Sequence, residues 1–274
     1  MKKILSLLFF AFWILGGSAA TTQTYHVKSK TMHCKLPVFV VTPDVDSDKA
    51  LPVLYLLHGY GGDHMAWQDC ITDLKPIADQ YQMIIVCPDA KKSWYFDSPV
   101  DKTSKFEKYV TEELIQWVDK EFKTIANRRG RAISGNSMGG HGAMWLSIRH
   151  KDLFGAVGTT SGGVDFRPFP ENWEIKAVLG EYEQNKELWE EHTVFHAIDQ
   201  LNDGELEIII DCGYDDFFFE VNQNLHDKLQ QKHIKHFYFT SPGEHSSIYW
   251  RESIYYQALF FKRYFDRNNQ ELHQ

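Results

Sequence analysis

One short segment of the 274-residue chain has the residue types that nucleophilic serine chemistry requires. Ser137 stands between Gly135 and Gly139 in the pattern Gly-x-Ser-x-Gly. A β-rich run, residues 129–134, precedes it, and a helix-compatible run, residues 140–150, follows it. This context favours a nucleophile elbow, in which the glycines let strand and helix approach closely and the turn exposes the serine hydroxyl. The pattern fixes few positions, so support from the rest of the chain is required.

A serine hydroxyl is a poor nucleophile at neutral pH, so Ser137 needs a general base. Of the 13 histidines, His245 is the best placed, because it follows the strand expected at 236–241 in a loop of turn residues. Such a loop, at the carboxyl edge of a sheet, can bring the imidazole within hydrogen-bonding distance of Ser137. His141 is nearer in sequence, but the start of a helix should direct its ring away from the hydroxyl.

An orienting carboxylate must hold the imidazole tautomer and stabilise the imidazolium. Asp215 and Asp216 follow the strand expected at 207–211, and both qualify, whereas Asp211 lies within that strand and qualifies less well. The residues themselves leave the choice between Asp215 and Asp216 open, because either one could instead cap the helix expected near Phe217. The order serine, aspartate, histidine along the chain is a known order for this triad.

The reaction also needs two backbone donors for the oxyanion. The N–H of Met138, directly after the nucleophile, is one candidate. The other is expected in the run His58-Gly59-Tyr60-Gly61-Gly62, which follows the apolar strand expected at 51–57. Its simplest donor is the N–H of Tyr60, and its glycines keep the loop thin enough for an acyl oxygen to reach it. A glycine-rich turn that binds no anion is the alternative.

Trp94 and Tyr95 follow the strand expected at 83–88, in a loop that should overhang the site. One interpretation is a substrate platform that stacks against a sugar or an aromatic acyl group. The other is a loop anchored by buried aromatic side chains. The chain is rich in aromatic residues, at 15%, but composition does not separate the two.

Strand-like and helix-like segments alternate along the chain, which predicts an α/β fold with a mostly parallel central sheet and helices on both faces. No linker or repeat interrupts residues 21–274, so they are expected to form a single domain. The expected strands are residues 24–32, 35–42, 51–57, 83–88, 129–134, 156–160, 207–211 and 236–241, and the expected helices are residues 71–82, 104–123, 140–150, 217–232 and 247–265.

Residues 1–20 have the pattern of a secretory signal peptide. Lys2 and Lys3 precede an apolar run, and small residues at 16–20 offer a cleavage site. The apolar run is shorter than the roughly 20 residues that span a bilayer. We therefore expect a mature chain that begins near Thr21, is exported to the periplasm or secreted, and has no membrane anchor after cleavage.

The formal net charge of −8 argues against nucleic acid or an anionic membrane as the partner. Cys87 and Cys212 lie in apolar strand patterns and are expected to be buried thiols, whereas a bridge between Cys34 and Cys70 is left open. No cysteine spacing resembles a zinc site. The expected chemistry requires neither a metal nor an organic cofactor.

Several segments together match one known family. They are His58-Gly59-Tyr60-Gly61-Gly62, Ser93-Trp94-Tyr95-Phe96-Asp97-Ser98, Gly135-Asn136-Ser137-Met138-Gly139-Gly140, Asp211-Cys212-Gly213-Tyr214-Asp215-Asp216, and Gly243-Glu244-His245 with Trp250 beyond. Over about residues 38–265 the chain resembles the esterase D-like α/β-hydrolases. This family includes S-formylglutathione hydrolases, mycolyltransferases, tributyrin esterases, and the feruloyl and acetylxylan esterases of carbohydrate esterase family one. Its pattern implies Asp216 as the acid and His245 as the base.

The resemblance implies the α/β-hydrolase fold and a serine carboxylesterase that acts through Ser137, His245 and Asp216. Export, acidic charge and the Trp94-Tyr95 loop favour short acyl esters, with acetyl or feruloyl groups on plant-type carbohydrates as the expected substrates. Alternatives on the same fold are acyl transfer to another alcohol and lactone hydrolysis of a siderophore. A non-catalytic exported binding module is the alternative from another class, but it gives no reason to keep all three residues. The oligomeric state is left open.

Overall fold

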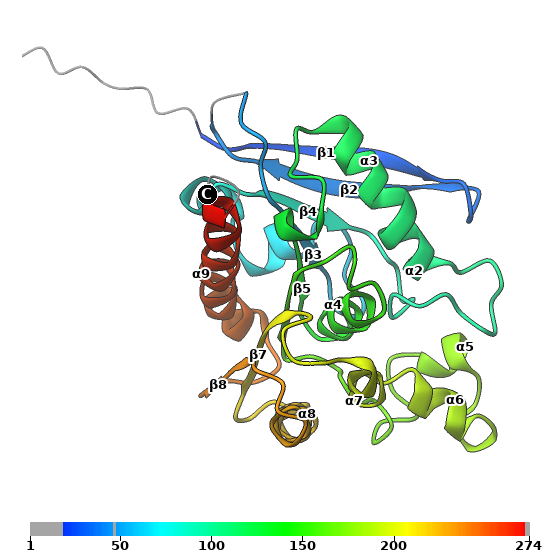
Figure 1. The fold of residues 1–274 in the computed structure, drawn as a ribbon. Coiled ribbons are helices and arrows are strands. Elements are labelled where there is room, and N and C mark those ends of the chain that lie inside the picture. Colours follow the sequence, from blue (N-terminus) through cyan, green and yellow to red (C-terminus); the bar gives the residue numbers. More distant parts are fainter. Residues whose placement is uncertain (1–18, 46–47, 272–274) are drawn as a thin grey trace, which may run out of the picture.

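The computed structural model describes residues 19–45 and 48–271 (Figure 1). This part of the chain forms an eight-stranded sheet in the order β1-β2-β4-β3-β5-β6-β7-β8. Strand β2 runs antiparallel to β1 and β4, and the other neighbouring pairs are parallel, which confirms the mostly parallel sheet. The strands are β1 (Thr21–Ser29), β2 (Cys34–Thr42), β3 (Val53–Leu57), β4 (Ile84–Pro88), β5 (Arg131–Gly135), β6 (Ala156–Thr160), β7 (Glu207–Gly213) and β8 (Phe237–Ser241).

Helices cover both faces of the sheet, as predicted (Figure 1). Helices α1 and α9 pack on one face, and α3, α4 and α8 pack on the other. The α-helices are α1 (Lys75–Tyr81), α2 (Phe106–Lys108), α3 (Ile115–Glu121), α4 (Met138–Arg149), α5 (Ile175–Leu179), α6 (Lys186–Glu191), α7 (Val194–Ala197), α8 (Phe219–Gln231) and α9 (Ser247–Glu271). Short π or 3₁₀ turns are η1 (Ala66–Ile71), η2 (Tyr109–Leu114), η3 (Arg128–Gly130), η4 (Tyr182–Gln184) and η5 (Ile198–Gln200).

The sequence of strand β3 has no alternation of polar and apolar residues. All of its residues are buried, because helices cover both faces. Successive side chains of a strand point to opposite faces. Tyr55 and Leu57 therefore enter the core beneath α4, while Leu54 and Leu56 enter the core beneath α1 and α9. A continuous apolar strand thus supplies two cores at once.

Two predicted helices differ from the structure. The helix predicted at 71–82 begins only at Lys75, with Pro76 in its first turn, where a missing N–H costs nothing. The residues before it form the separate π-helical turn η1. The helix predicted at 104–123 is present as α2, η2 and α3 in succession, with a π-helical middle that apolar periodicity does not reveal.

Residues 1–18 of the predicted signal peptide lie outside the described residues. No helix in the described ranges is long and apolar enough to cross a membrane. Cys87 and Cys212 are buried thiols, as predicted, and burial raises the pKa of Cys87. Cys34 and Cys70 are exposed and free, so the bridge that the sequence left open is not formed.

The carboxyl ends of β3, β5, β7 and β8 lie at one edge of the sheet, because these strands all run in the same direction. Each is followed by a predicted site residue: Tyr60 after β3, Ser137 after β5, Asp216 after β7 and His245 after β8. In open α/β sheets this is the edge at which ligands bind. The topology therefore assembles residues from four distant parts of the chain.

Candidate active site

Ser137 forms the turn between β5 and α4, with φ 56° and ψ −118°. Residues other than glycine rarely adopt this backbone conformation, so the surrounding structure must impose it. A Cβ on Gly135 would lie 2.5 Å from the carbonyl carbon of Gly139, and a Cβ on Gly139 would lie 2.4 Å from the carbonyl oxygen of Leu57. Neither position has room for a side chain. The predicted elbow is therefore present, and its glycines are required by close backbone packing.

His245 lies between Ser137 and Asp216 and contacts both. Its Nε2 is 2.9 Å from Ser137 Oγ, and its Nδ1 is 3.0 and 2.9 Å from the two carboxylate oxygens of Asp216. Because a carboxylate accepts hydrogen bonds, Nδ1 carries the proton of the neutral ring. Nε2 is then free to accept the serine O–H. The structure brings together the three side chains that the sequence selects.

Asp216, rather than Asp215, faces the imidazole. The Asp216 side chain is fully buried, and one of its oxygens also accepts the N–H of Phe218 at 2.8 Å. Asp215 is exposed, but its backbone N–H donates to the Gly243 carbonyl at 3.0 Å. That bond ties the loop after β7 to the loop that carries His245, and so the two neighbours serve the site in different ways.

Asp211, the third aspartate considered, lies within β7 and does not reach His245. Its carboxylate is buried and accepts hydrogen bonds from Thr160, Ser253 and Gln257 at 2.6 to 2.8 Å. Burial raises the pKa of Asp211 to about 6, although these hydrogen bonds oppose the shift. Its partners come from β6 and α9, so it joins the sheet to the terminal helix.

The predicted oxyanion donors lie next to the nucleophile. Met138 is the first residue of α4, and an amide at that position has no acceptor within its own helix. On the opposite side, a Cβ on Gly59 would lie 3.3 Å from Ser137 Cβ, so the loop after β3 contacts the nucleophile. Tyr60 follows Gly59 and lines the same pocket as Ser137. Both residues thus lie where donors to an oxyanion on Ser137 are expected.

A pocket of about 300 Å³ is lined by Ser137 and His245. Its wall is neutral: within the described part of the chain, no Lys, Arg, Asp or Glu lines it. The other lining residues are Gly59, Tyr60, Gly61, Gly62, Ala66, Cys70, Ile71, Asn136, Trp173, Ser247 and Trp250. A neutral wall favours neutral ligands, because a charged group would lose its hydration without gaining a counter-charge.

A larger cavity, of about 590 Å³, lies away from these residues and centres on Glu107. This carboxylate accepts from Trp145, Arg149 and His150. Burial opposes its ionisation, but the hydrogen bonds from His150 and Arg149 lower the pKa of Glu107 to about 2. The charge of Glu107 is thus paired within the cavity. Among the described residues, no group of three or more His, Cys, Asp or Glu is arranged to hold a metal ion.

Trp94 and Tyr95 do not line the pocket, so the predicted substrate platform is wrong. Their φ angles are 55° and 63°, a backbone conformation that turns both rings into the interior, where they are 1% and 0% exposed. Trp94 packs against His141 and Phe166, and the Tyr95 hydroxyl donates to the His58 carbonyl at 3.1 Å. The alternative interpretation, a loop held by buried aromatic anchors, describes both residues.

Other aromatic side chains surround His245, and among them only Trp250 belongs to the segments that match the family. The Phe217 ring lies 4.2 Å from the imidazole, and Trp250 meets it edge-on at 5.0 Å. Trp173 stacks on Phe217 at 5.5 Å and lines the pocket. Phe217 could have been found, because it directly follows Asp216. Trp173 could not, because it comes from an irregular segment and has φ 51°.

His141 is directed away from the nucleophile, as expected from its place at the start of α4. Its Nδ1 is 3.2 Å from the Gly163 carbonyl oxygen, and its ring is fully buried. Burial lowers the pKa of His141 to about 3, so this ring stays neutral at physiological pH. Aromatic rings enclose it, including Trp94 and Phe96. It is therefore part of the core.

Comparison with known proteins finds esterases that are similar to this chain. The family model described as "Putative esterase" matches residues 29–261. The acetyl esterase of Caldicellulosiruptor saccharolyticus is 27% identical over 225 residues, which cover 77% of this chain and 83% of that protein. The family match extends across the segments that carry Ser137, Asp216 and His245.

Solved structures share the fold over almost the whole chain. FphF, a fluorophosphonate-binding serine hydrolase of Staphylococcus aureus, has a TM-score of 0.79 at 21% identity, covering 90% of this chain and 99% of that chain. A ferulic acid esterase has a TM-score of 0.77 at 26% identity, covering 90% and 98%. The expected α/β-hydrolase fold is thereby confirmed.

Proposed function

We propose that Ser137, His245 and Asp216 form the catalytic triad of this chain. The premise is that the chain belongs to the esterase family whose model it matches and is a carboxylic ester hydrolase. The observation that carries this proposal is the continuous hydrogen-bonded chain from Asp216 through His245 to Ser137. The contact to the nucleophile is 2.9 Å long, within the range that proton transfer needs. A binding module without catalysis would not require this alignment.

In the first half of the reaction, His245 Nε2 takes the proton of Ser137 as Oγ attacks the ester carbonyl. The carbonyl π bond becomes an oxyanion, which accepts hydrogen bonds from the amides of Met138 and Tyr60. The intermediate collapses, the ester C–O bond breaks, and the alcohol leaves with the proton from Nε2. Asp216 stabilises the imidazolium that exists between these two proton transfers.

In the second half, water replaces the alcohol. His245 Nε2 takes a proton from the water as its oxygen attacks the acyl-enzyme, and a second oxyanion forms at the same two amides. The bond between the acyl carbon and Ser137 Oγ then breaks, and Oγ regains the proton from Nε2. The acid leaves and the triad returns to its starting state. Water is consumed as the second substrate, and the imidazole of His245 carries each proton.

For the substrate, we propose a neutral ester with a short acyl group. The pocket holds about 300 Å³ and has no ionised wall residue in the described part of the chain. Ile71, Ala66 and Trp250 give it an apolar surface suited to a small acyl chain. At the side of His245, Trp173 and the half-exposed Phe217 offer stacked rings to the alcohol or to an aromatic acyl group.

More specifically, we propose acetyl or feruloyl esters on plant-type carbohydrates. The names of two similar proteins, an acetyl esterase and a ferulic acid esterase, support this choice. The Trp173–Phe217 pair supports it too, because flat rings stack well against sugars and phenolic groups. The acidic chain suits a neutral polymer better than an anionic lipid surface.

A substrate series tests this proposal. The kcat/KM of the purified chain should be highest for acetyl and butyryl p-nitrophenyl esters and fall through octanoyl and palmitoyl. It should also hydrolyse acetylated xylan or methyl ferulate. A value that rises through palmitoyl would contradict the short-acyl substrate, and activity on simple esters alone would remove the plant-polymer part. An ester product in the presence of a competing alcohol would indicate acyl transfer instead.

Two tryptophans separate substrate contact from structural anchoring. Trp173→Ala should lower kcat/KM on methyl ferulate about 5-fold, because one aromatic contact contributes roughly 1 kcal/mol. The Tm should change little, since Trp173 is only partly buried. Trp94→Ala is the matched control: its fully buried ring should lower Tm and affect every substrate alike. If Trp173→Ala, like Trp94→Ala, lowered kcat/KM equally for ferulate and acetate esters, the role of Trp173 would be refuted.

We also propose that the protein is exported. The support is the sequence of residues 1–20, with two lysines, an apolar run and small residues at the expected cleavage site. Mass spectrometry of the extracellular or periplasmic fraction should find a chain that starts near Thr21. A cytoplasmic product that keeps Met1 would contradict the proposal.

A further inference from the structure

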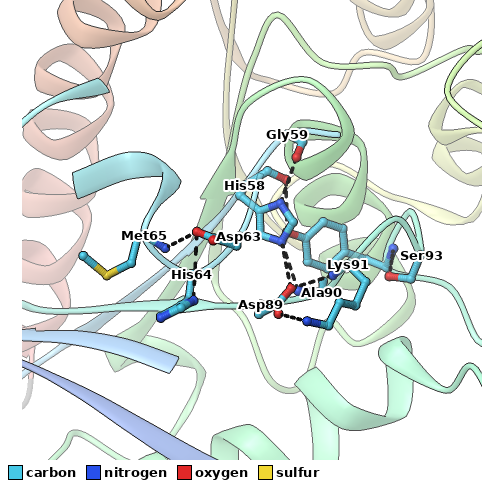
Figure 2. Close-up of polar contacts among 10 residues, drawn as sticks. His58, Gly59, Asp63, His64, Met65, Asp89, Ala90, Lys91 and Ser93 are labelled. Atoms are coloured by element: carbon cyan, nitrogen blue, oxygen red, sulfur yellow. Dashed lines mark hydrogen bonds and ion pairs between the residues drawn. The ribbon is translucent and has the colours of Figure 1, made fainter. Parts of the chain in front are cut away.

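His58 is a buried histidine that the proposed reaction does not use. It directly follows β3 and precedes the Gly59–Tyr60 peptide, and its side chain is 1% exposed. Figure 2 shows the ring between the Gly59 carbonyl and the segment of Asp89, Ala90 and Lys91 that follows β4. The imidazole thus connects the proposed oxyanion loop to a neighbouring strand end.

The contacts of the ring determine which nitrogen carries the proton. The N–H of Ala90 donates to His58 Nε2 at 3.0 Å, and an amide N–H only donates, so Nε2 is an unprotonated acceptor. His58 Nδ1 lies 2.8 Å from the Gly59 carbonyl oxygen, which only accepts, so Nδ1 carries the hydrogen. Burial lowers the pKa of His58, which favours the neutral form that both contacts need.

The nearest carboxylate does not alter this assignment. Asp89 Oδ1 is 3.8 Å from His58 Nε2, which is too long for a hydrogen bond. The carboxylate instead accepts the backbone N–H of Lys91 at 2.8 Å and pairs with the Lys91 ammonium group (Figure 2). These contacts hold the turn that presents the Ala90 N–H to the imidazole.

The hydrogen bond from Nδ1 sets the direction of one peptide plane. The Gly59 carbonyl oxygen accepts from His58 Nδ1 and from the N–H of Gly62 at 3.1 Å. The chain has no cis peptide in its described part, so the Tyr60 N–H points opposite to the Gly59 carbonyl. The N–H therefore points away from the His58 ring, and Gly59 itself lies against Ser137.

We propose that His58 is a positioning residue for ester hydrolysis: its neutral imidazole, protonated at Nδ1, orients the Gly59–Tyr60 peptide so that the Tyr60 N–H faces the oxyanion. His58 touches no substrate and acts only through the backbone. Donors that are already oriented need no reorganisation as charge develops, and this gives them their large effect on rate. The inference rests on the oxyanion hole of the proposed function.

The first test needs no substitution. A long-range proton–nitrogen correlation spectrum of the wild-type protein distinguishes the imidazole tautomers. The expected result is a His58 ring that is neutral at pH 7, with its hydrogen on Nδ1. A ring protonated on Nε2, or on both nitrogens, would overturn the proposal whether or not any variant folds.

The second test compares two amide replacements. In His58→Asn the shorter amide can still donate near the position of Nδ1, whereas in His58→Gln the amide reaches the position of Nε2 instead. We expect His58→Gln to lower kcat by roughly 10- to 100-fold, less than the loss of a whole oxyanion donor. The KM should change little, and His58→Asn should retain more activity. His64→Asn, in the same loop but outside the pocket lining, is the matched control and should behave as wild type.

An inhibitor separates orientation from general stability. An aryl trifluoromethyl ketone adds to the nucleophile and places its oxyanion in the hole, so its affinity for His58→Gln should fall by the same factor as kcat. The proposal would be overturned if a folded His58→Gln variant had the kcat and the inhibitor affinity of wild type. It would also be overturned if the variant had a lower Tm but an unchanged inhibitor affinity. Full activity of Ser137→Ala would instead refute the proposed triad, so the two failures are distinguishable.

Discussion

Two buried aspartates near the end of β7 have similar burial and different partners. Asp211 accepts hydrogen bonds from Thr160, Ser253 and Gln257, which are all neutral. Asp216 accepts from the imidazole of His245 and from one backbone N–H. The first carboxylate is held by β6 and α9, and the second by the loop that carries the general base.

The difference teaches how surroundings assign a role to a buried carboxylate. Burial without a nearby cation disfavours the charge, and the pKa of Asp211 therefore rises to about 6. Such a group joins structural elements. Asp216 instead contacts a ring that becomes cationic during the proposed reaction, so its charge is used when the imidazolium forms. We expect the two to differ most when each is replaced by its amide.

The largest expected effect comes from Asp216→Asn. The amide should stabilise the wrong imidazole tautomer and lower kcat by roughly 10⁴-fold, as in the best-studied triad. The Tm should stay close to that of wild type, because the side chain keeps its size. Steady-state hydrolysis of p-nitrophenyl acetate and a thermal melt measure both quantities.

Asp215→Asn and Asp211→Asn are the controls for that substitution. Asp215 is exposed and contributes its backbone to the site, so its amide variant should lose less than 10-fold in kcat, well below the roughly 10⁴-fold expected at Asp216. Asp211→Asn should likewise keep most of its activity. A larger loss at Asp215 than at Asp216 would transfer the orienting role to Asp215.

The second-largest expected effect is on how the free energy of unfolding depends on pH. The folded chain raises the pKa of Asp211 from 3.8 to about 6. The folded state thus binds the proton of Asp211 more tightly than the unfolded state does. The stability that Asp211 contributes is therefore complete at pH values below its pKa in the unfolded chain, and it is lost as the pH rises through its pKa in the folded chain. A shift of this size corresponds to roughly 3 kcal/mol.

Asp211→Asn cannot ionise and should lack that loss. Urea unfolding at pH 4, 5, 6 and 7 should show the free energy of unfolding of wild type falling relative to the variant over this range. A constant difference between wild type and Asp211→Asn at every pH would contradict the raised pKa.

Much of this arrangement could be predicted from the sequence because it depends on local patterns. The elbow around Ser137 has a spacing imposed by close backbone contact, and His245 follows a strand in a turn-forming loop. Asp216 could be separated from Asp215 only through the family resemblance. Their side chains point in different directions because of the turn after β7, which a single sequence does not specify.

The aromatic residues show where sequence reasoning fails. Trp94 and Tyr95 lie in a loop that is expected from the sequence to overhang the site, with a platform and a buried anchor both left open, and positive φ angles turn both rings into the core. Trp173 has the same type of backbone conformation and lies at the pocket. Packing between distant segments imposes such backbone conformations, so the sequence could not predict which of these three aromatic side chains are buried and which one is exposed to the pocket. The donor role proposed for His58 also depends on Ala90, which belongs to another strand end.

The smallest expected effect comes from Ser253→Ala, which removes one hydrogen bond to Asp211. Gln257 still donates to the same oxygen, so the carboxylate keeps a partner. We expect the free energy of unfolding to fall by about 1 kcal/mol, the usual contribution of one hydrogen bond. The urea midpoint measures this change. A matching fall in kcat would contradict the separation between the two aspartates.

The central claim is that Ser137 is the nucleophile activated by His245 and Asp216. A fluorophosphonate probe followed by peptide mass spectrometry tests it most directly. We predict a single adduct on Ser137 in the wild-type protein, much slower labelling in Asp216→Asn, and no adduct in Ser137→Ala. Labelling of Ser137→Ala at the wild-type rate, or an adduct on another serine, would contradict the account.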